Sequence, residues 1–494
     1  MRPLSESLFV RKSVAAALAE AAAQPHGLAR RLGTRSLVFL GVGAVVGAGV
    51  FSSIGELAAG NAHRPGAGPA LVISFIVTAI ACGFAAMAYA EMASVVPVAG
   101  SAYTYAYVTL GKLPAWIIGW DLVIEYAIGN IYVAQSWAEY FQVLLGRTVG
   151  LQLPVWMTTD VQTAAHTEAI ASVAPHIGSF TVAFNLPAAF ITCVLTIVLV
   201  RGIRGSARVN SLLVLGKLLL LCMFVGVGAF YVEPAHWRPF APGGVRGVWT
   251  AASLAFFSYI GFDAISTAAE EVKDPTKQLP RAMIIALGLC AVIYVLTALV
   301  MTGLVPSSEL GVGDPLAYVL LRVHLERLAG VMALGAVLAV TAVLLVFQMG
   351  QPRILMCMAR DGLLPPAFAR VHPRFATPAF GTIVTGVFVA AMPSLMTPSQ
   401  ALELTSIGTL FAFFLVSVGV IVLRVSQPAM HRPFRCPGYP WVPGLSALFC
   451  VILMCGLPLM NWLRFGVWLL LGLLLFGLYG HRRGCETVPI DPPG

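Results

Sequence analysis

Charged residues are scarce in this sequence of 494 residues, because only 10% are charged whereas 59% are hydrophobic. Soluble proteins average about 25% charged residues, which cover the surface that faces water. The scarcity therefore excludes an ordinary soluble globular protein. It indicates a chain that crosses a membrane several times.

Histidine and cysteine do not occur in the patterns that a proton relay, a metal site or a disulfide framework would need. All nine histidines lie outside the long apolar runs, which excludes a histidine proton relay or a histidine metal site within the membrane. The nine cysteines form no external Cys-x-x-Cys pair, so no disulfide framework is implied. No cluster of Asp with His or of Ser with His marks a membrane-embedded enzyme. We therefore predict no metal, no cofactor and no catalytic residue.

The sequence contains twelve apolar runs, most of which reach the ~20 residues that a helix needs to cross a bilayer. They lie at residues 36–57, 68–92, 114–145, 182–201, 209–232, 249–271, 282–305, 328–351, 377–397, 402–424, 442–461 and 463–482. The fold class predicted from these runs is an all-α integral membrane protein with twelve transmembrane helices.

Basic residues are unevenly distributed between the two sides of these runs. With the N terminus placed inside, most of the 30 lysines and arginines fall in cytoplasmic segments, as the positive-inside rule requires. We therefore predict a multi-pass protein of the cytoplasmic membrane with both termini in the cytoplasm. This bias also explains the net charge of +9, so no nucleic acid partner is expected. Arg30, Arg31 and Arg35 directly precede the first run, which argues against a cleaved signal peptide.

Two of the apolar runs are interrupted. Four glycines (Gly41, Gly43, Gly47 and Gly49) fall within nine residues of the first run, and Tyr259–Asp263 interrupts the sixth. In hydrocarbon every backbone N–H and C=O needs a partner, so a broken helix must be buried in protein or line a cavity. Paired broken spans in corresponding halves of a chain indicate the binding site of a secondary transporter.

The order of these interruptions predicts an inverted repeat. Runs one to five begin with a broken span and runs six to ten begin with another, and because five is odd the second set enters the membrane in the opposite orientation. The predicted organisation is a cytoplasmic tail, two five-span repeats, two appended spans and a second tail, at residues 1–35, 36–232, 249–424, 442–482 and 483–494.

Four sequence segments carry a resemblance to a known family: Gly47–Phe51, Phe256–Pro275, Gly350–Pro365 and Arg432–Arg435. They resemble the amino acid-polyamine-organocation superfamily, and Phe256–Pro275 is most similar to its bacterial cationic amino acid transporter branch. The resemblance implies a LeuT-like fold with broken first and sixth spans, alternating access, an L-amino acid substrate and symport with protons.

The first break is the predicted binding site for the carboxylate of the substrate. Gly47, Ala48 and Gly49 would begin the outer half-helix, where unpaired N–H groups and the positive end of the helix dipole favour an anion. The alternative is that Gly43-x-x-x-Gly47 serves only close helix packing, which is common in membrane spans. Both explanations are compatible with each other.

The second break would supply the opposite pole. A half-helix that ends near Phe257 and Ser258 leaves carbonyls free to accept hydrogen bonds from an ammonium group. An α-amino acid carries both charges and so fits the two breaks together. Tyr259 and Phe262 either close the site or pack as ordinary aromatic residues, and Asp263 is expected to cap the inner half-helix as part of a gate.

Three further polar residues lie within the spans. Buried Lys217 can titrate, whereas snorkelling toward the cytoplasm is the alternative; the resemblance implies that it replaces a sodium ion and carries the coupling proton. Glu125 near the middle of the third span either reads a cationic substrate, relays protons or is a structural acid. Gln348 either lines the side-chain pocket or makes polar contacts between helices.

The predicted function is an amino acid transporter coupled to protons, and not an enzyme. An exchanger and a transport-inactive amino acid sensor on the same fold remain alternatives, whereas a channel is disfavoured because half-spans that meet near the midplane imply occlusion. The identity of the amino acid and the oligomeric state stay open.

Overall fold

The chain folds almost entirely into helices. The computed structural model describes residues 8–17, 32–61, 64–98, 100–178, 180–202, 207–267, 272–375 and 377–480. Within this part of the chain the only strands form two short antiparallel hairpins, which pair Gly60 with Pro65 and His176 with Thr181. They are β1 (Gly60–Asn61) with β2 (Arg64–Pro65), and β3 (His176–Ile177) with β4 (Phe180–Thr181). The all-α class is therefore confirmed.

The helices of the first half begin with the broken span. They are α3 (Thr34–Val45), α4 (Ile54–Ala59), α5 (Leu71–Val95), α6 (Ser101–Thr109), α7 (Lys112–Val123), α8 (Gly129–Thr148), α9 (Val161–His166), α10 (Glu168–Ala171), α11 (Leu186–Arg201) and α12 (Ala207–Gly228). Local sequence explains where some of them start: the Asn185 side chain accepts from the N–H of Ala188, which caps α11.

The helices of the second half begin with the other broken span. They are α13 (Gly244–Ala255), α14 (Ala264–Thr267), α15 (Pro275–Leu304), α16 (Pro315–Arg322), α17 (Glu326–Arg360), α18 (Ala379–Ala391), α19 (Pro398–Ser426), α20 (Trp441–Cys455) and α21 (Leu459–Leu475). At the start of α19, Thr397 and Gln400 form a reciprocal capping box around Pro398, which occupies the first helical position.

Among the described residues, seven helical stretches are long and apolar enough to cross a membrane, and the bent pair of α3 with Gly49–Ala59 makes an eighth. The seven are Gly68–Val95, Lys112–Thr148, Leu212–Tyr231, Pro275–Leu304, Glu326–Arg360, Pro398–Ser426 and Leu459–Tyr479. Shorter apolar helices lie at Leu186–Arg201, Ala379–Ser394 and Trp441–Cys455. A multi-pass membrane protein is thus confirmed, and the count of twelve spans stays a prediction.

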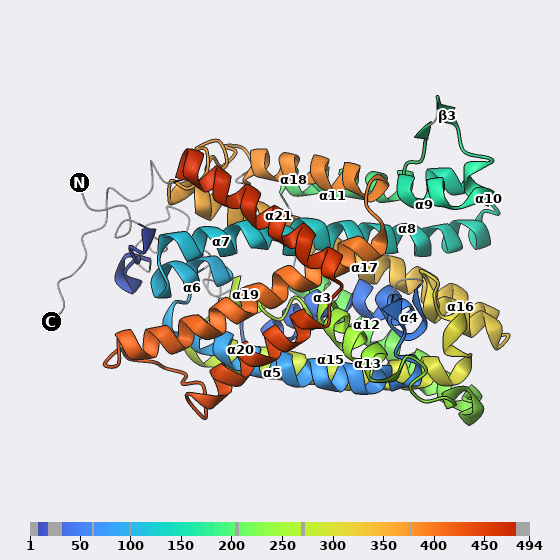
Figure 1. Ribbon diagram of the computed structural model, residues 1–494, viewed down its shortest axis with the longest axis horizontal. Helices are drawn as coiled ribbons and strands as arrows, with labels where there is room; N and C mark the ends of the chain where they lie inside the picture. Colours follow the sequence, from blue (N-terminus) through green and yellow to red (C-terminus); the bar gives the residue numbers. More distant parts are fainter. Residues whose placement is uncertain are drawn as a thin grey trace.

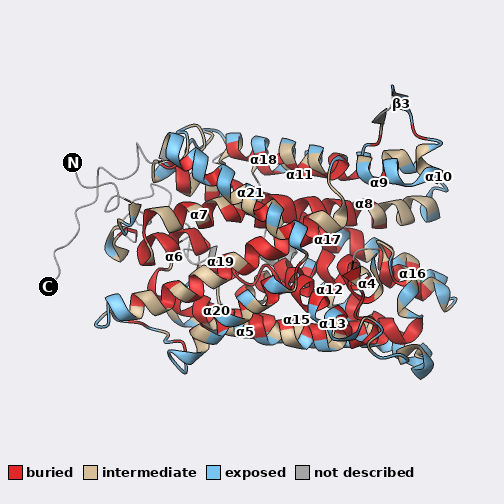
Figure 2. Cartoon of the chain, in the orientation of Figure 1, coloured by how far each residue is buried: buried red, intermediate tan, exposed pale blue. Residues whose placement is uncertain are grey.

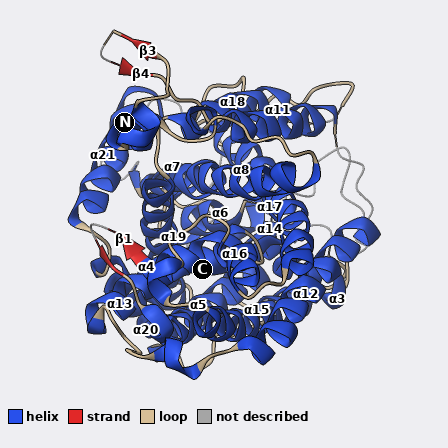
Figure 3. Ribbon diagram, turned by 90° about the vertical axis from the view of Figure 1, so that its right-hand side faces the viewer, coloured by secondary structure: helices blue, strands red, loops and turns tan. Residues whose placement is uncertain are grey.

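The helices form a bundle around the first broken span. Helices α5 and α15 run side by side along one edge of the bundle, and α11 and α18 run side by side along the opposite edge (Figure 1). Helix α3 packs against α15, α12 and α17 between these edges. The end-on view shows the same arrangement, with α3 and α12 close to α15 (Figure 3). Both halves of the chain therefore contribute walls around the break.

Burial follows this arrangement. Buried residues concentrate in the middle of the bundle, whereas the helices at the edges carry exposed residues on their outer faces (Figure 2). Val46, Val50 and Phe51 of the broken span have no exposed surface. Large apolar side chains on the outer faces, such as Leu219 and Val387, are exposed, as expected where the surrounding solvent is lipid. The break therefore lies inside protein.

A buried ionic cluster joins α5, α19 and the loop before α20 at one end of the bundle. Glu91 of α5 is 1% exposed and receives two hydrogen bonds from Arg424 of α19, at 2.9 and 2.5 Å. It also accepts from the backbone N–H of Cys436 at 2.7 Å and lies 3.4 Å from the Arg432 guanidinium. Because a buried carboxylate is costly without such partners, Glu91 fixes α5, α19 and the loop before α20 relative to one another.

We expect Glu91→Ala to destabilise the protein by about 3 kcal/mol, because it leaves two arginines near the core without their counter-charge. The midpoint of thermal unfolding in detergent should fall clearly below that of the unmodified protein. Glu168→Ala, which removes an exposed carboxylate from α10, is the control and should leave the midpoint unchanged. Equal midpoints for both variants would contradict the anchoring role of Glu91.

Candidate functional site

The first break lies between α3 and a short π-helical turn. Helix α3 ends at Val45, the chain bends by 43°, and the turn Gly49–Ser53 continues into α4. Among the described residues, no backbone carbonyl accepts from the N–H groups of Gly47, Ala48 or Gly49. The outer half-helix therefore begins with free donors, as a site for an anion requires.

The carbonyl end of α3 is satisfied by side chains from two other helices. The Lys217 ammonium of α12 donates to the carbonyls of Gly43 and Val46, at 2.9 and 3.1 Å. The Tyr294 hydroxyl of α15 donates to the carbonyl of Val45 at 2.9 Å. Lys217 is only 3% exposed, so it does not snorkel to the membrane surface. A lysine charge at this position lies at the negative end of the α3 dipole.

The second break is a 3-10 turn followed by extended chain. Helix α13 ends at Ala255, and the turn Phe256–Tyr259 follows it. The Phe257 carbonyl already accepts from the N–H of Ile260 at 3.2 Å, because the tighter turn pairs residues three apart. No backbone donor in the described chain reaches the carbonyls of Ser258 or Tyr259. The carbonyls without a backbone donor therefore belong to Ser258 and Tyr259, one residue later than the predicted Phe257 and Ser258.

Gly261 lets the chain leave this turn beside α3. Its φ of +116° is a conformation that residues with a side chain rarely adopt. A Cβ atom on Gly261 would lie 2.9 Å from the carbonyl carbon of Ala44. The second break therefore passes directly along the backbone of the inner half of the first span.

The two breaks contact each other through their backbones. A Cβ atom on Gly49 would lie 2.5 Å from the Cα of Ser258. The Ser53 hydroxyl donates to the Gly49 carbonyl at 2.6 Å and lies 3.4 Å from the Ser258 hydroxyl. A Cβ on Gly47 would lie 2.4 Å from Val343 of α17. Gly47 and Gly49 thus pack closely against neighbouring segments. The N–H groups without a backbone acceptor belong to the same short stretch, Gly47–Gly49.

Aromatic side chains from both breaks pack in different directions. The Phe257 ring meets Tyr132 of α8 edge to face, with centroids 5.0 Å apart. Phe262 packs on Tyr89 and Phe413. The Tyr259 hydroxyl donates to the Phe75 carbonyl in α5 at 3.1 Å, so Tyr259 is part of the packing between helices. Phe257 is therefore the aromatic residue that stays beside the contact between the breaks.

Sequence reasoning missed Tyr132 and Ser53. Tyr132 lies seven residues after Glu125, two turns along the same face of the third span, which is a periodicity that the sequence shows. Ser53 is a polar residue one turn after Gly49 in the half-helix that follows the break. Both signals were available in the sequence.

Glu125 lies in a π-helical turn, Ile124–Ile128, between α7 and α8. It is 1% exposed, and neither carboxyl oxygen has a hydrogen-bond partner among the described residues. The acids Asp263 and Asp121 are its charged neighbours, and the Thr409 side chain also lies near it. A carboxyl group in such surroundings is suited to a proton or to the cationic group of a ligand.

Asp263 holds the loop of the second break. Its carboxylate accepts from the N–H of Gly261 at 3.2 Å and from the Tyr126 hydroxyl at 3.3 Å, and its carbonyl accepts from the N–H of Ser266 at 2.8 Å. These bonds fix the extended chain that joins the turn to α14. These bonds of the Asp263 carboxylate go to the loop and to Tyr126, and capping of the inner half-helix by this side chain stays a prediction.

Gln348 does not face the break. Its amide donates to the Thr192 carbonyl at 3.2 Å and to the Thr196 hydroxyl at 2.5 Å, both in α11. This is the polar contact between helices that was the alternative for this residue. We therefore leave Gln348 out of the site.

Polar contacts join the segments at the end of the bundle where α3 and α15 begin. Leu32, just before α3, pairs with Val272, just before α15, and its carbonyl accepts from the N–H of Lys273 at 3.1 Å. Lys12 forms an ion pair of 2.9 Å with Asp361 at the end of α17. The Tyr103 hydroxyl of α6 donates to the same carboxylate at 2.7 Å; burial and this carboxylate raise the pKa of Tyr103 well above its usual value, so it stays a donor.

At the opposite end of the bundle, the second half of the first span is tied to α19. Glu56 of α4 accepts hydrogen bonds from the Arg64 guanidinium and from the Ser399 hydroxyl at the start of α19. Arg64 is 6% exposed. The described structure thus holds the region of the breaks by polar contacts at both ends.

Comparison with known proteins agrees with this geometry. Residues 32–469 match the family model described as amino acid permease. The chain is 44% identical to the branched-chain amino acid permease BcaP of Bacillus subtilis, over 97% of this chain and 98% of the relative. It is 42% identical to the methylthioribose transporter of the same organism, with the same coverage. It is 36% identical to the vacuolar cationic amino acid transporter 4 of Arabidopsis thaliana, over 82% of this chain and 65% of the relative.

We expect Gly49→Ala to abolish substrate binding, because the added Cβ forces the two breaks apart at Ser258. Insertion into the membrane should persist, since the rest of both spans is unchanged. Gly466→Ala in α21, where a Cβ meets no atom within 4 Å, is the matched control. The measurement is a titration of the purified protein with amino acids. Binding by Gly49→Ala with unchanged affinity would contradict the assignment.

Proposed function

Because the chain belongs to the amino acid permease family of the amino acid-polyamine-organocation superfamily, whose members are transporters and not enzymes, we propose that it carries amino acids across the cytoplasmic membrane by alternating access, coupled to protons. The contact between the two breaks supports this most directly. Free N–H groups at Gly47–Gly49 and free carbonyls at Ser258 and Tyr259 lie on either side of the contact between Gly49 and Ser258.

These two poles match the backbone of an α-amino acid. The N–H groups begin a half-helix and favour the carboxylate, and the carbonyls end a half-helix and favour the ammonium group. A molecule with only one of these charges would leave the other pole without a partner. Phe257 and Tyr132 cover the contact and would lie beside the bound substrate.

The proposed architecture has twelve spans in a LeuT-like fold, which the family implies. Residues 36–232 and 249–424 would form two inverted five-span repeats, each beginning with one of the breaks, and residues 442–482 would add two further spans. Both terminal segments, 1–35 and 483–494, would lie in the cytoplasm. The observed pairing of the α3 break with the turn at Phe256–Tyr259 supports this division.

The proposed function does not yet specify which side chain the substrate carries. The relative with 44% identity is named a branched-chain amino acid permease, so a neutral aliphatic amino acid is the first candidate. A cationic amino acid is the second, because Glu125 lacks a basic partner among its described neighbours. A thermal-shift screen of the twenty amino acids and methylthioribose would identify the ligand, since a compound that binds the folded state raises its stability.

We propose that Lys217 carries the coupling proton. Protonated Lys217 can donate to the carbonyls of Gly43 and Val46, and loss of its charge would weaken this hold on the inner half-helix. The ligand that shifts the equilibrium between outward-open and inward-open forms would then be a proton. An exchanger and a transport-inactive sensor are the alternatives, and only a carrier concentrates substrate in proteoliposomes.

We expect Lys217→Ala proteoliposomes to exchange labelled amino acid across the membrane yet fail to accumulate it when only the outside is acidified. The unmodified protein should accumulate it without sodium. The Glu168→Ala protein serves as the control for reconstitution. A sodium requirement in the unmodified protein, or accumulation by Lys217→Ala, would overturn the proton-coupling proposal. Exchange without accumulation in both proteins would identify an exchanger.

We expect Glu125→Gln to separate the two substrate classes. If Glu125 reads a positive side chain, the variant should bind lysine and arginine at least tenfold more weakly, while leucine and alanine binding changes little, because only the cationic substrates lose a charge-assisted bond. The measurement is a set of binding titrations on the same preparation. A uniform loss would instead assign Glu125 to proton transfer or structure, and unchanged affinities would end its role in the site.

A further inference from the structure

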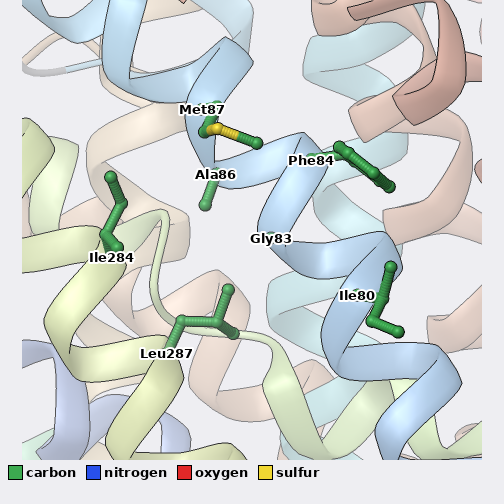
Figure 4. A pocket seen from close by; sticks show the side chains of 7 residues that line it. All are labelled: Ile80, Gly83, Phe84, Ala86, Met87, Ile284 and Leu287. Carbon is green, nitrogen blue, oxygen red and sulfur yellow. The ribbon is translucent and has the colours of Figure 1, made fainter. Parts of the chain in front are cut away.

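An apolar groove of about 260 Å³ opens on the outer face of the bundle between α5 and α15. Ile80, Gly83 and Met87 of α5 and Ile284 and Leu287 of α15 line it (Figure 4). Ile80 and Ile284 are 49% and 45% exposed. Gly83 keeps the groove open, because a Cβ there would meet no atom within 4 Å. The groove lies within two membrane spans and therefore faces lipid.

Two basic residues continue the wall of this groove toward the cytoplasm. Lys277 and Arg281 of α15 are exposed and precede Ile284 by seven and three residues, on the same face of the helix. At 1.5 Å per residue, Arg281 lies about 4.5 Å and Lys277 about 10.5 Å beyond Ile284 along the axis. Neither is among the described residues that form an ion pair or a side-chain hydrogen bond.

Acidic groups do not neutralise this pair within the described chain. The nearest described carboxylate along the chain is Asp274, which accepts a hydrogen bond from the Thr276 hydroxyl at 2.8 Å. Helix α15 begins at Pro275, so the free N–H groups of its first turn add positive potential at the same end. The cytoplasmic end of the groove is therefore positive, and its floor is apolar.

We propose that this groove is a binding site for an anionic phospholipid of the cytoplasmic leaflet. One acyl chain lies in the groove between Gly83 and Leu287, and the phosphate is bound by Arg281 and Lys277. The occupant must combine an apolar chain with an anionic end at the cytoplasmic interface, and anionic phospholipids supply both. A zwitterionic phospholipid would fill the groove equally well but gain less from the basic pair.

The position of the site gives the lipid a structural role that does not depend on the proposed transport function. Helix α15 packs along α5 on one side and against α3 on another. A lipid that bridges α5 and α15 therefore braces α15, which packs against the inner half of the first broken span, on its neighbour α5.

The first test is a lipid titration of the full-length protein by native mass spectrometry, with phosphatidylglycerol and phosphatidylcholine that carry the same chains. The unmodified protein should bind phosphatidylglycerol more tightly. Lys277→Ala with Arg281→Ala should lower that affinity about 25-fold, roughly fivefold for each charge at the membrane surface, and leave phosphatidylcholine unaffected. Arg370→Ala, an exposed cytoplasmic arginine, is the control and should bind as the unmodified protein does.

The second test fills the groove. Gly83→Leu should weaken binding of both lipids by the same factor, whereas Gly466→Leu, at an equally open glycine of α21, should not. Thermal midpoints measured without added lipid check that each variant is folded. Equal affinity of the unmodified protein for the two lipids, equal loss in the double variant and the Arg370 control, or unchanged binding by folded Gly83→Leu would each overturn the proposal.

Discussion

The structure depends on how the carbonyl end of α3 is satisfied inside the membrane. A helix that stops in the middle of a bilayer exposes carbonyls that have no water to bond, and each would cost several kcal/mol. Lys217 and Tyr294 supply the missing donors. These two side chains come from α12 and α15, so the same bonds that permit the break also fix α3 to a helix from each half of the chain.

This constraint links the break to Lys217, the residue proposed above to carry the coupling proton. A sodium ion could satisfy carbonyls in the same way, whereas a lysine does so with N–H donors whose bonds are stronger while the amine is protonated. The chain therefore has a covalently attached cation at the negative end of a half-helix. Any reaction that removes that charge acts directly on the part of the fold that holds the inner half-span in place.

The membrane class and the first break could be predicted from the sequence because the bilayer allows few structures. Long apolar runs must be helices, and Gly41–Gly49 cannot remain an uninterrupted one without help. The partner of Lys217 could not be predicted in this way. It lies about 170 residues away in the chain, and only the family resemblance placed the lysine beside the first span.

The details of the site depended on the directions of individual carbonyls and side chains, which hydrophobic periodicity does not specify. The 3-10 turn at Phe256–Tyr259 pairs the Phe257 carbonyl and turns Tyr259 toward α5, whereas an ordinary helix end would have left both at the break. The sequence assigns Gln348 to a helix but not to a face of that helix. That its side chain points toward α11 depends on how the helices pack. The sequence also gave no sign that Gly49 and Ser258, 209 positions apart, touch through their backbones.

The pairing of Leu32 with Val272 has a mechanical consequence. The segments that lead into α3 and α15 are hydrogen-bonded as neighbouring strands would be, and α15 also packs along α5. A swing of α3 therefore pulls on the first residues of α15, a helix of 30 residues. In the alternating-access cycle proposed above, such a swing is then either a concerted movement of α3, α15 and α5, or a movement that must first release the β-bridge between Leu32 and Val272.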